Sequence, residues 1–230
     1  MASAVTGETA RLEAARLDAA RRAVDLVGNG MVLGLGTGDT AATAVRELGR
    51  RLAAGRLTGI AGVPTSKAAR AVALEAGVPL TDFSARPILD LTIDGADEVT
   101  PVGDLLKGRG GALLHEKLAA VNSRRLVIVV DPTKLVRRLG ERAPLPIEVV
   151  PFAWTTHLEF LSALGATPAL RTLPGEAAPY ETDDAHYIID AHFPGGIPDP
   201  VALQDALARR PGIVETGLFL GMSPEVVVGR

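Results

Sequence analysis

The most constraining feature of the 230-residue sequence is a repeated unit in which a short apolar run is followed by a polar turn and a helical stretch. The first such unit runs from Met31 through a glycine-rich turn into an alanine-rich stretch after Thr40. Apolar runs recur at 57–63, 88–93 and 126–130, and each leads into a polar turn. Strands that alternate with helices in this way form a mostly parallel sheet covered on both faces. We therefore expect an α/β protein whose main domain is Rossmann-like.

Both ends of the chain are expected to belong to this main domain. Apolar residues at helical spacing over 10–27 predict an amphipathic first helix, which the glycines at 28–30 end. The apolar stretch 225–228 predicts a last strand that returns to the first sheet.

The sequence pattern changes in the middle of the chain, and it predicts a second, smaller α+β domain of ferredoxin-like type over 140–218. Prolines there interrupt short strand-like runs such as 147–150 and 187–189, and two segments have helical spacing, 152–164 and 201–209. The Rossmann-like catalytic domain is then expected to comprise 1–139 plus 219–230.

Composition excludes several classes of function. The chain has no cysteine, so it has no disulfide framework, thiolate nucleophile or cysteine-based zinc site. Its 24 basic and 27 acidic residues are interspersed, without the basic stripe that nucleic-acid binding needs. No apolar run approaches the ~18 residues of a membrane span, and acidic residues near the N-terminus argue against a transit peptide. We expect a cytoplasmic protein with no membrane or nucleic-acid partner.

A glycine-rich turn at 36–41 fits the dinucleotide pattern G-x-G-x-x-A. The second strand of a dinucleotide fold should end in an acidic residue, but here it ends in Val63-Pro64-Thr65-Ser66. The turn also lacks the lysine of a P-loop. Two interpretations remain: an anion cradle, in which the hydroxyls of Thr37 and Thr40 stand at a helix N-terminus, or a purely structural turn.

Two carboxylates follow the run at 88–93. Asp94 and Asp97 flank Gly95, and the carboxyl ends of parallel strands border the ligand crevice of such folds. The alternative is that Asp97 caps a helix while Asp94 closes a turn.

A third segment combines a cation, a glycine-rich turn and an acid. Lys107 precedes the turn at 108–111, and Glu116 follows on a predicted helix over 112–121. Glu116 is a candidate base, or else Glu116 and Lys117 are an ordinary charged pair on a solvated helix face. The four histidines show no metal-ligand spacing, and the serines lack the context of a hydrolase nucleophile, so we expect neither a metal site nor a catalytic triad.

These segments together resemble type A ribose-5-phosphate isomerase. The match runs in order over about 10–228 and includes the segments 34–40, 62–66, 94–98, 107–117, 131 with 134, 144–151 and 211–219.

The resemblance implies that ribose 5-phosphate and ribulose 5-phosphate are interconverted through an enediolate, without metal or organic cofactor, in the non-oxidative pentose phosphate pathway. Position by position, Glu116 corresponds to the catalytic base, and Asp94, Asp97 and Lys107 to further catalytic residues. The substrate-binding segments correspond to Thr37, Gly38, Asp39, Thr40, Asp94, Gly95, Ala96, Asp97, Lys107, Gly108, Arg109, Gly110 and Lys134. A homodimer or a dimer of dimers is the assembly that the resemblance implies.

The chain departs from the family pattern at Asp39, where serine is usual, and at Arg16, where a lysine often stands. A carboxylate in this turn would repel a sugar phosphate, and we hypothesise that Arg16 offsets it. Two rival functions stay open: an isomerase of another phosphosugar, and a non-catalytic sugar-phosphate sensor. A sensor predicts loss of the base, yet Glu116 is present.

Overall fold

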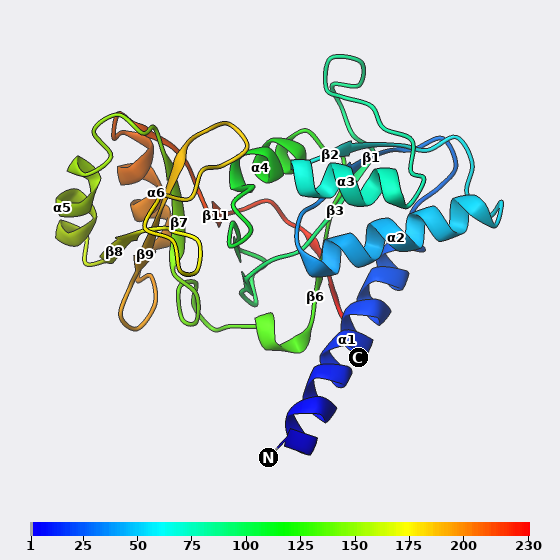
Figure 1. Ribbon diagram of the computed structural model, residues 1–230, viewed down its shortest axis with the longest axis horizontal. Helices are drawn as coiled ribbons and strands as arrows, with labels where there is room; N and C mark the ends of the chain where they lie inside the picture. The colour runs from blue at the N-terminus through cyan, green and yellow to red at the C-terminus, as the bar shows by residue number, and fades with distance from the viewer. Residues whose placement is uncertain (1) are drawn as a thin grey trace. The chain divides into compact units, whose positions relative to one another are not determined.

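The computed structural model describes residues 2–230, with side chains from residue 7 onward (Figure 1). The chain divides into two compact units. The first contains Met1–Gly95, Leu118–Lys134 and Ser223–Arg230, and the second contains Ala96–Lys117 and Leu135–Met222. No helix in the described part of the chain is long and apolar enough to cross a membrane.

The first unit is built on a five-stranded parallel sheet of order β12-β6-β3-β1-β2, as expected for an α/β fold. Its strands are β1 (Val32–Leu35), β2 (Ala61–Pro64), β3 (Leu91–Asp94), β6 (Leu126–Val130) and β12 (Glu225–Val228). The five residues of β6 are all buried, which is typical of a strand covered on both faces. The last strand, β12, pairs with β6 in parallel, so its predicted return to the first sheet is confirmed.

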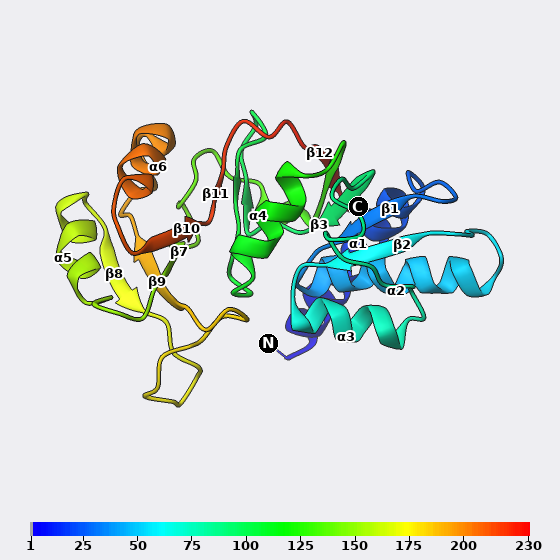
Figure 2. The ribbon, with the colours of Figure 1, turned by 90° about the horizontal axis from the view of Figure 1, so that it is seen from above.

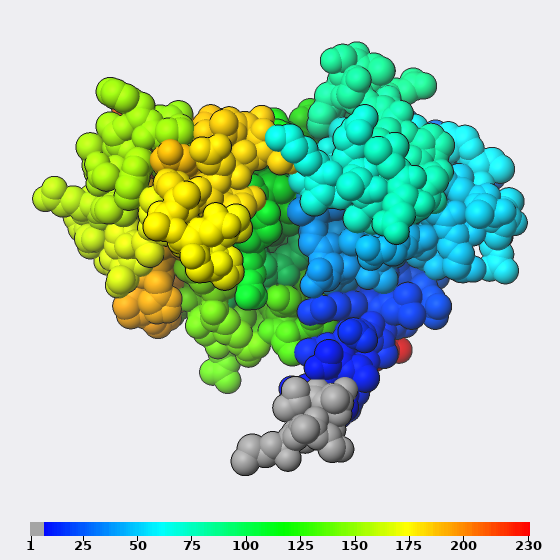
Figure 3. All heavy atoms as spheres, in the orientation of Figure 1, coloured from blue at the N-terminus to red at the C-terminus, as the bar shows by residue number. Residues whose placement is uncertain are grey.

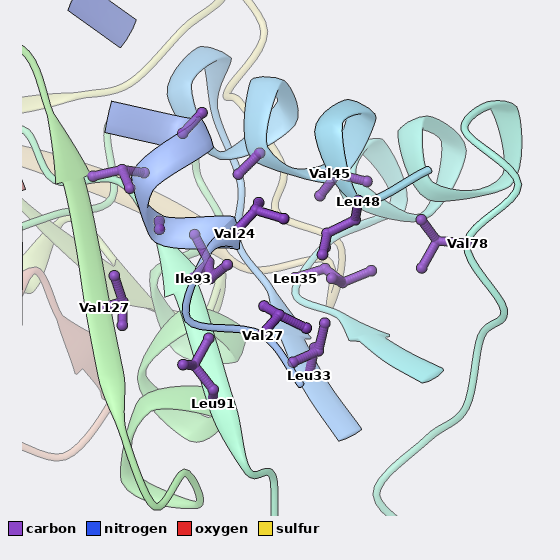
Figure 4. Packing of buried hydrophobic residues seen from close by; sticks show 14 of the residues in the cluster. Val24, Val27, Leu33, Leu35, Val45, Leu48, Val78, Leu91, Ile93 and Val127 are labelled. Carbon is purple, nitrogen blue, oxygen red and sulfur yellow. The ribbon is translucent and has the colours of Figure 1, made fainter. Parts of the chain in front are cut away.

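Helices α1 (Ala2–Val24), α2 (Asp39–Ala53) and α3 (Lys67–Glu75) contribute buried residues to one shared core cluster with the sheet. Figure 4 shows valine and leucine side chains of α1 and α2 directed at those of β1, β3 and β6. The outer surfaces of the same three helices lie next to one another in Figure 3. A smaller cluster contains Ala119 of α4 (Leu113–Val121) together with Val63 and Leu89.

Strand order reverses between β1 and β3, because the chain runs from β1 to β2 on one side and then crosses to pair β3 on the other side of β1. In parallel sheets this switch point leaves a crevice at the carboxyl ends of the strands, where ligands bind. Here Gly36–Thr40 follow β1, and Asp94 is the last residue of β3, with Gly95 after it.

Glu47 on α2 is a buried carboxylate with an acid-sensitive contribution to stability. It accepts hydrogen bonds from Arg50 at 2.6 and 2.7 Å and from Arg51 at 2.8 Å. The bonds from Arg50 lower the pKa of Glu47 to about 2, despite the opposing effect of burial. Because the folded pKa lies below the unfolded value, this stabilisation is present above about pH 4.5 and is lost as the pH falls toward 2.

We expect Glu47→Gln to lower the free energy of unfolding by about 1–2 kcal/mol near pH 6, allowing for solvent around Arg50. The difference from the wild type should shrink between about pH 4.5 and 2, as followed by urea denaturation. A difference that stays constant over this range would show that the carboxylate charge contributes nothing.

The second unit contains a four-stranded antiparallel sheet of order β10-β7-β9-β8 (Figure 2). It also contains a three-stranded sheet of order β11-β5-β4. Their strands are β4 (Glu98–Val99), β5 (Leu105–Leu106), β7 (Leu145–Val149), β8 (Thr167–Leu170), β9 (Tyr187–His192), β10 (Ile213–Thr216) and β11 (Leu218–Phe219). Two helices, α5 (Thr156–Ala163) and α6 (Pro200–Ala208), cover the core of the larger sheet. Helices and antiparallel strands therefore form the expected α+β arrangement.

The expectation that every strand of the first sheet leads into a helix was wrong for β3 and β6. Strand β3 is followed by the hairpin β4–β5, whose turn is closed by bonds between Thr100 and Asp104, and β6 by the short 3-10 turn Pro132–Lys134. Glu98 stabilises the hairpin, because its buried carboxylate accepts hydrogen bonds from the backbone N–H groups of Gly140, Arg142 and Ala143.

Residues 96–117, which we placed in the main domain on sequence grounds, group with the second unit. The physical reason is their pairing: β4 and β5 form a sheet with β11, and the N–H of Lys107 donates to the carbonyl of Gly217 at 2.9 Å.

Candidate active site

The candidate site residues fall into two groups, one in each unit. The first group follows β1, β3 and β6 of the parallel sheet and contains Thr37–Thr40, Asp94–Gly95 and Lys134. The second lies around the β4–β5 hairpin and the start of α4, and contains Ala96–Asp97, Lys107–Gly110 and Glu116.

Asp94 organises the turn that follows β1. One of its carboxylate oxygens accepts the N–H of Thr37 at 3.2 Å and that of Gly95 at 2.7 Å. Gly36 has no room for a side chain, because a Cβ there would collide with the Asp94 carboxylate. The glycine of the motif therefore serves this close approach, and the buried Asp94 is a structural member of the turn as well as a candidate catalytic residue.

Thr37 uses both of its donors within the protein. Its N–H goes to Asp94, and its hydroxyl lies 2.8 Å from the hydroxyls of both Thr65 and Ser66, which follow β2. Ser66 in turn caps α3 by accepting the N–H of Ala69 at 2.9 Å. A hydroxyl network thus stands where a dinucleotide fold would have its acidic residue.

The N-terminus of α2 remains the candidate anion-binding part of this turn. Gly38 is the N-cap residue of α2, and as a glycine it has no side chain that could accept an N–H of the helix. The first N–H groups of a helix have no partner within it, and the helix dipole adds positive potential there. A hollow of about 490 Å³ adjoins this turn, lined by Glu13, Arg16, Gly36, Gly38, Asp39, Ala42, Thr43, Arg46, Ala68, Ala69 and Val72.

The hypothesis that Arg16 offsets Asp39 is supported by their contact. The guanidinium of Arg16 lies 3.6 Å from Asp39 and 3.4 Å from Asp131, so one cation bridges the start of α2 and the end of β6. Burial alone would raise the pKa of Asp131, but hydrogen bonds from Thr133 and the charges of Lys134 and Arg16 hold it below its usual value. Asp131 therefore stays ionised and keeps Arg16 and Lys134 near the end of β6.

Glu116 and Lys107 form a buried ion pair in the second group. The ammonium of Lys107 lies 3.1 Å from a carboxylate oxygen of Glu116, and their side chains are only 4% and 5% exposed. Glu116 occupies the first turn of α4, where the helix dipole also favours a negative charge. The ammonium of Lys107 lies 5.4 Å from the centre of the buried Phe219 ring.

The interpretation of Glu116 and Lys117 as a solvated helix face was wrong. Lys117 is itself largely buried: it pairs with Glu215 at 2.6 Å, donates to the carbonyl of Thr216 at 2.8 Å and lies 4.9 Å from the centre of the Phe219 ring. Burial lowers the pKa of Lys117 from its ordinary value. The two neighbouring residues of α4 are therefore neutralised by different partners.

Asp97 caps no helix in the described part of the chain. Its carboxylate accepts the backbone N–H of Arg109 at 2.9 Å. This bond connects the turn after Lys107 to the residue that precedes β4. The side chain of Arg109 is exposed, which fits the view that the backbone of the turn matters more than this side chain.

Sequence reasoning missed Arg171, Tyr180 and Asp190, which hold this group in place, and it gave no individual role to Glu215 and Phe219 of the segment 211–219. All five lie more than 60 residues along the chain from the turn that they support or from Lys117.

Comparison with known proteins shows the family of this chain. Residues 61–230 match the sequence profile of the family "Ribose 5-phosphate isomerase A (phosphoriboisomerase A)". A ribose-5-phosphate isomerase A of Deinococcus radiodurans is 50% identical over 217 residues, which cover 94% of either chain. One of Roseiflexus castenholzii is 48% identical over 93% of this chain and 90% of its own.

Solved structures of the same family have the same fold. A D-ribose-5-phosphate isomerase in complex with phospho-erythronic acid superposes with a TM-score of 0.91 at 39% identity, over 95% of each chain. The ribose 5-phosphate isomerase A of Methanocaldococcus jannaschii gives 0.88 at 38% identity, also over 95% of each chain. The chain belongs to the ribose 5-phosphate isomerase A family.

Proposed function

We propose that this protein interconverts D-ribose 5-phosphate and D-ribulose 5-phosphate, with Glu116 as the base that moves a proton between C2 and C1. The observation that carries the proposal is the buried pair of Glu116 and Lys107 in a chain of this family. The nearby ammonium favours the ionised carboxylate, which is the form that can accept a proton.

The proposed reaction begins with the open-chain aldose. Glu116 takes the proton from C2, the electron pair of the C2–H bond forms a C1–C2 double bond, and the C1 carbonyl oxygen becomes an enediolate oxygen. Glu116 then returns the proton to C1, and the proton of the C2 hydroxyl passes to the C1 oxygen, which leaves a C1 hydroxyl and the C2 carbonyl of the ketose. Lys107 and the N–H groups of Gly108 and Gly110 stabilise the enediolate, an effect worth about 3–4 kcal/mol per donor in other enzymes.

Asp94 and Asp97 are proposed to handle hydroxyl protons and the opening of the sugar ring. Thr37, Gly38, Thr40 and Lys134 are proposed to contact the substrate phosphate, and Thr37 also holds the turn through its bonds to Asp94 and Ser66. That a relative binds phospho-erythronic acid, a phosphorylated sugar acid, supports a sugar phosphate as ligand. The homodimer or dimer of dimers stays a prediction from family resemblance, and the cytoplasmic location stays a prediction from the sequence.

The test is conversion of ribose 5-phosphate to ribulose 5-phosphate by the purified protein, with EDTA present and a panel of other phosphosugars alongside. Metal-independent conversion with ribose 5-phosphate as the preferred substrate is expected. Conversion of another phosphosugar in its place would overturn the substrate assignment, and no turnover of any would favour a sensor.

Asp39 should weaken phosphate binding to a small extent. Its side chain is 89% exposed and pairs loosely with Arg16, so its charge is mostly screened. We expect Asp39→Ser to lower KM for ribose 5-phosphate about 2- to 5-fold, with a larger effect at low salt. Asp205→Ser, an exposed site on α6, is the control. An unchanged KM at low salt would show that Asp39 does not tune binding.

A further inference from the structure

Arg171, just after β8, contacts the turn that follows Lys107. One guanidinium nitrogen donates to the carbonyl of Gly108 at 3.0 Å and to that of Arg109 at 3.1 Å. Its other nitrogens pair with both oxygens of Asp190 on β9, at 2.8 and 2.5 Å. Because the side chain is only 13% exposed and bonded at both ends, its position is well defined.

Tyr180 holds the next part of the same turn. Its hydroxyl donates to the carbonyl of Gly110 at 3.4 Å, and its ring fills the space beside Gly111, where a Cβ would collide with it. The guanidinium of Arg171 lies 5.9 Å from the centre of the Tyr180 ring. Three successive carbonyls, those of 108, 109 and 110, are thus held by Arg171 and Tyr180.

Holding a carbonyl also fixes the N–H of the same peptide unit, because that unit is planar and trans and its N–H points the opposite way. The carbonyl of Gly108 shares a peptide with the N–H of Arg109, which donates to Asp97 at 2.9 Å. The carbonyl of Arg109 shares a peptide with the N–H of Gly110. Arg171 therefore sets the direction of the Arg109 N–H, which donates to Asp97, and of the Gly110 N–H.

We propose that Arg171, held by Asp190, is a positioning residue for this reaction: it orients the peptides 108–109 and 109–110 so that the turn holds Asp97. The proposal rests on the proposed function of Asp97 and the turn. Arg171 and Asp190 also line one hollow of about 340 Å³ with Asp97 and Arg109. Lysine cannot replace Arg171, because one ammonium cannot reproduce a bidentate carboxylate pair and two carbonyl bonds together.

The first experiment compares kcat/KM of Arg171→Gln and Arg171→Lys with a matched control, Arg51→Gln. Arg51 is similarly buried at 16% exposure and also bonds two carboxylates and a backbone carbonyl, those of Asp25, Glu47 and Arg21, but lies in the first unit on α2. We expect both Arg171 variants to lose about 10- to 100-fold in kcat/KM, as supporting residues do elsewhere. Arg51→Gln should lose stability with little change in kcat/KM. Wild-type kcat/KM in Arg171→Gln would overturn the proposal.

A double-mutant cycle with Asp97→Asn separates positioning from general damage. If Arg171 acts through Asp97, Arg171→Gln should cost much less in the Asp97→Asn background than in the wild type. Arg51→Gln should cost the same in both backgrounds. Full additivity of Arg171→Gln with Asp97→Asn would overturn the proposal.

Amide hydrogen exchange of residues 107–111 gives a readout that does not depend on turnover. Exchange at Arg109 should accelerate at least 10-fold in Arg171→Gln but not in Arg51→Gln, and unchanged exchange would overturn the positioning role. If Arg171→Gln does not fold, Asp190→Asn makes the same test. A wild-type protein that fails to isomerise ribose 5-phosphate overturns the proposed function, while the exchange result still decides whether Arg171 holds the turn.

Discussion

Glu116→Gln is expected to lower kcat for ribose 5-phosphate isomerisation by about 10²- to 10⁴-fold, the range for loss of a general base. Glutamine keeps the size of the side chain, but it cannot take up a proton from C2. KM should change far less, because the proposed phosphate contacts lie on other residues. The measurement is steady-state kinetics with EDTA present, together with exchange of the C2 proton into deuterated solvent.

Glu47→Gln is the matched control for this variant. Glu47 is also a buried helical glutamate in ion pairs with basic side chains, but it lies on α2 of the first unit. We expect this control to lose stability and keep its turnover. A Glu116→Gln protein that retained wild-type kcat would refute the assignment of the base.

The fold could be predicted from sequence wherever burial imposes a pattern. The run at 126–130 is buried on both faces of a sheet, so an uninterrupted apolar pattern marks β6 at the predicted bounds. The hairpin β4–β5 has only two residues per strand and therefore too short a pattern to predict a period. Its stability depends on Glu98 accepting backbone bonds from 140–143, which no local pattern reveals.

The candidate site was predictable in part for the same reason. The turn at 36–40 follows β1 and Asp94 ends β3, and parallel topology gathers such strand ends at one edge of a sheet. Spacing could not predict that Lys107 pairs with Glu116, because residues nine apart across a turn and a helix start have no fixed distance. Nor could spacing predict the role of Arg171, because the carbonyls that it binds in the turn lie 62 and 63 residues away along the chain.

A second lysine beside the Phe219 ring, Lys117, provides a control for the role of Lys107. Lys107 and Lys117 both approach Phe219, but Lys107 pairs with Glu116 and Lys117 with Glu215. Lys117→Met should lower the Tm with only a small loss of turnover, because its carboxylate partner is outside the proposed catalytic set. Lys117→Met also removes a buried cation from the same ring, so it controls for packing around Phe219.

Lys107→Met is expected to lose both activity and stability. Loss of one enediolate donor should lower kcat/KM about 10²- to 10³-fold. Removing one member of a buried ion pair leaves the other charge in a dry environment, and the free energy of unfolding should fall by about 3–5 kcal/mol.

The double variant Lys107→Met/Glu116→Gln distinguishes these two effects. Since it removes both charges of a pair whose side chains are only 4% and 5% exposed, it should be more stable than Lys107→Met alone while remaining inactive. Urea denaturation and kinetics on the two single variants and the double variant measure this coupling. Additive losses of stability would mean that the two charges do not stabilise each other, and Lys107 would then act on the substrate alone.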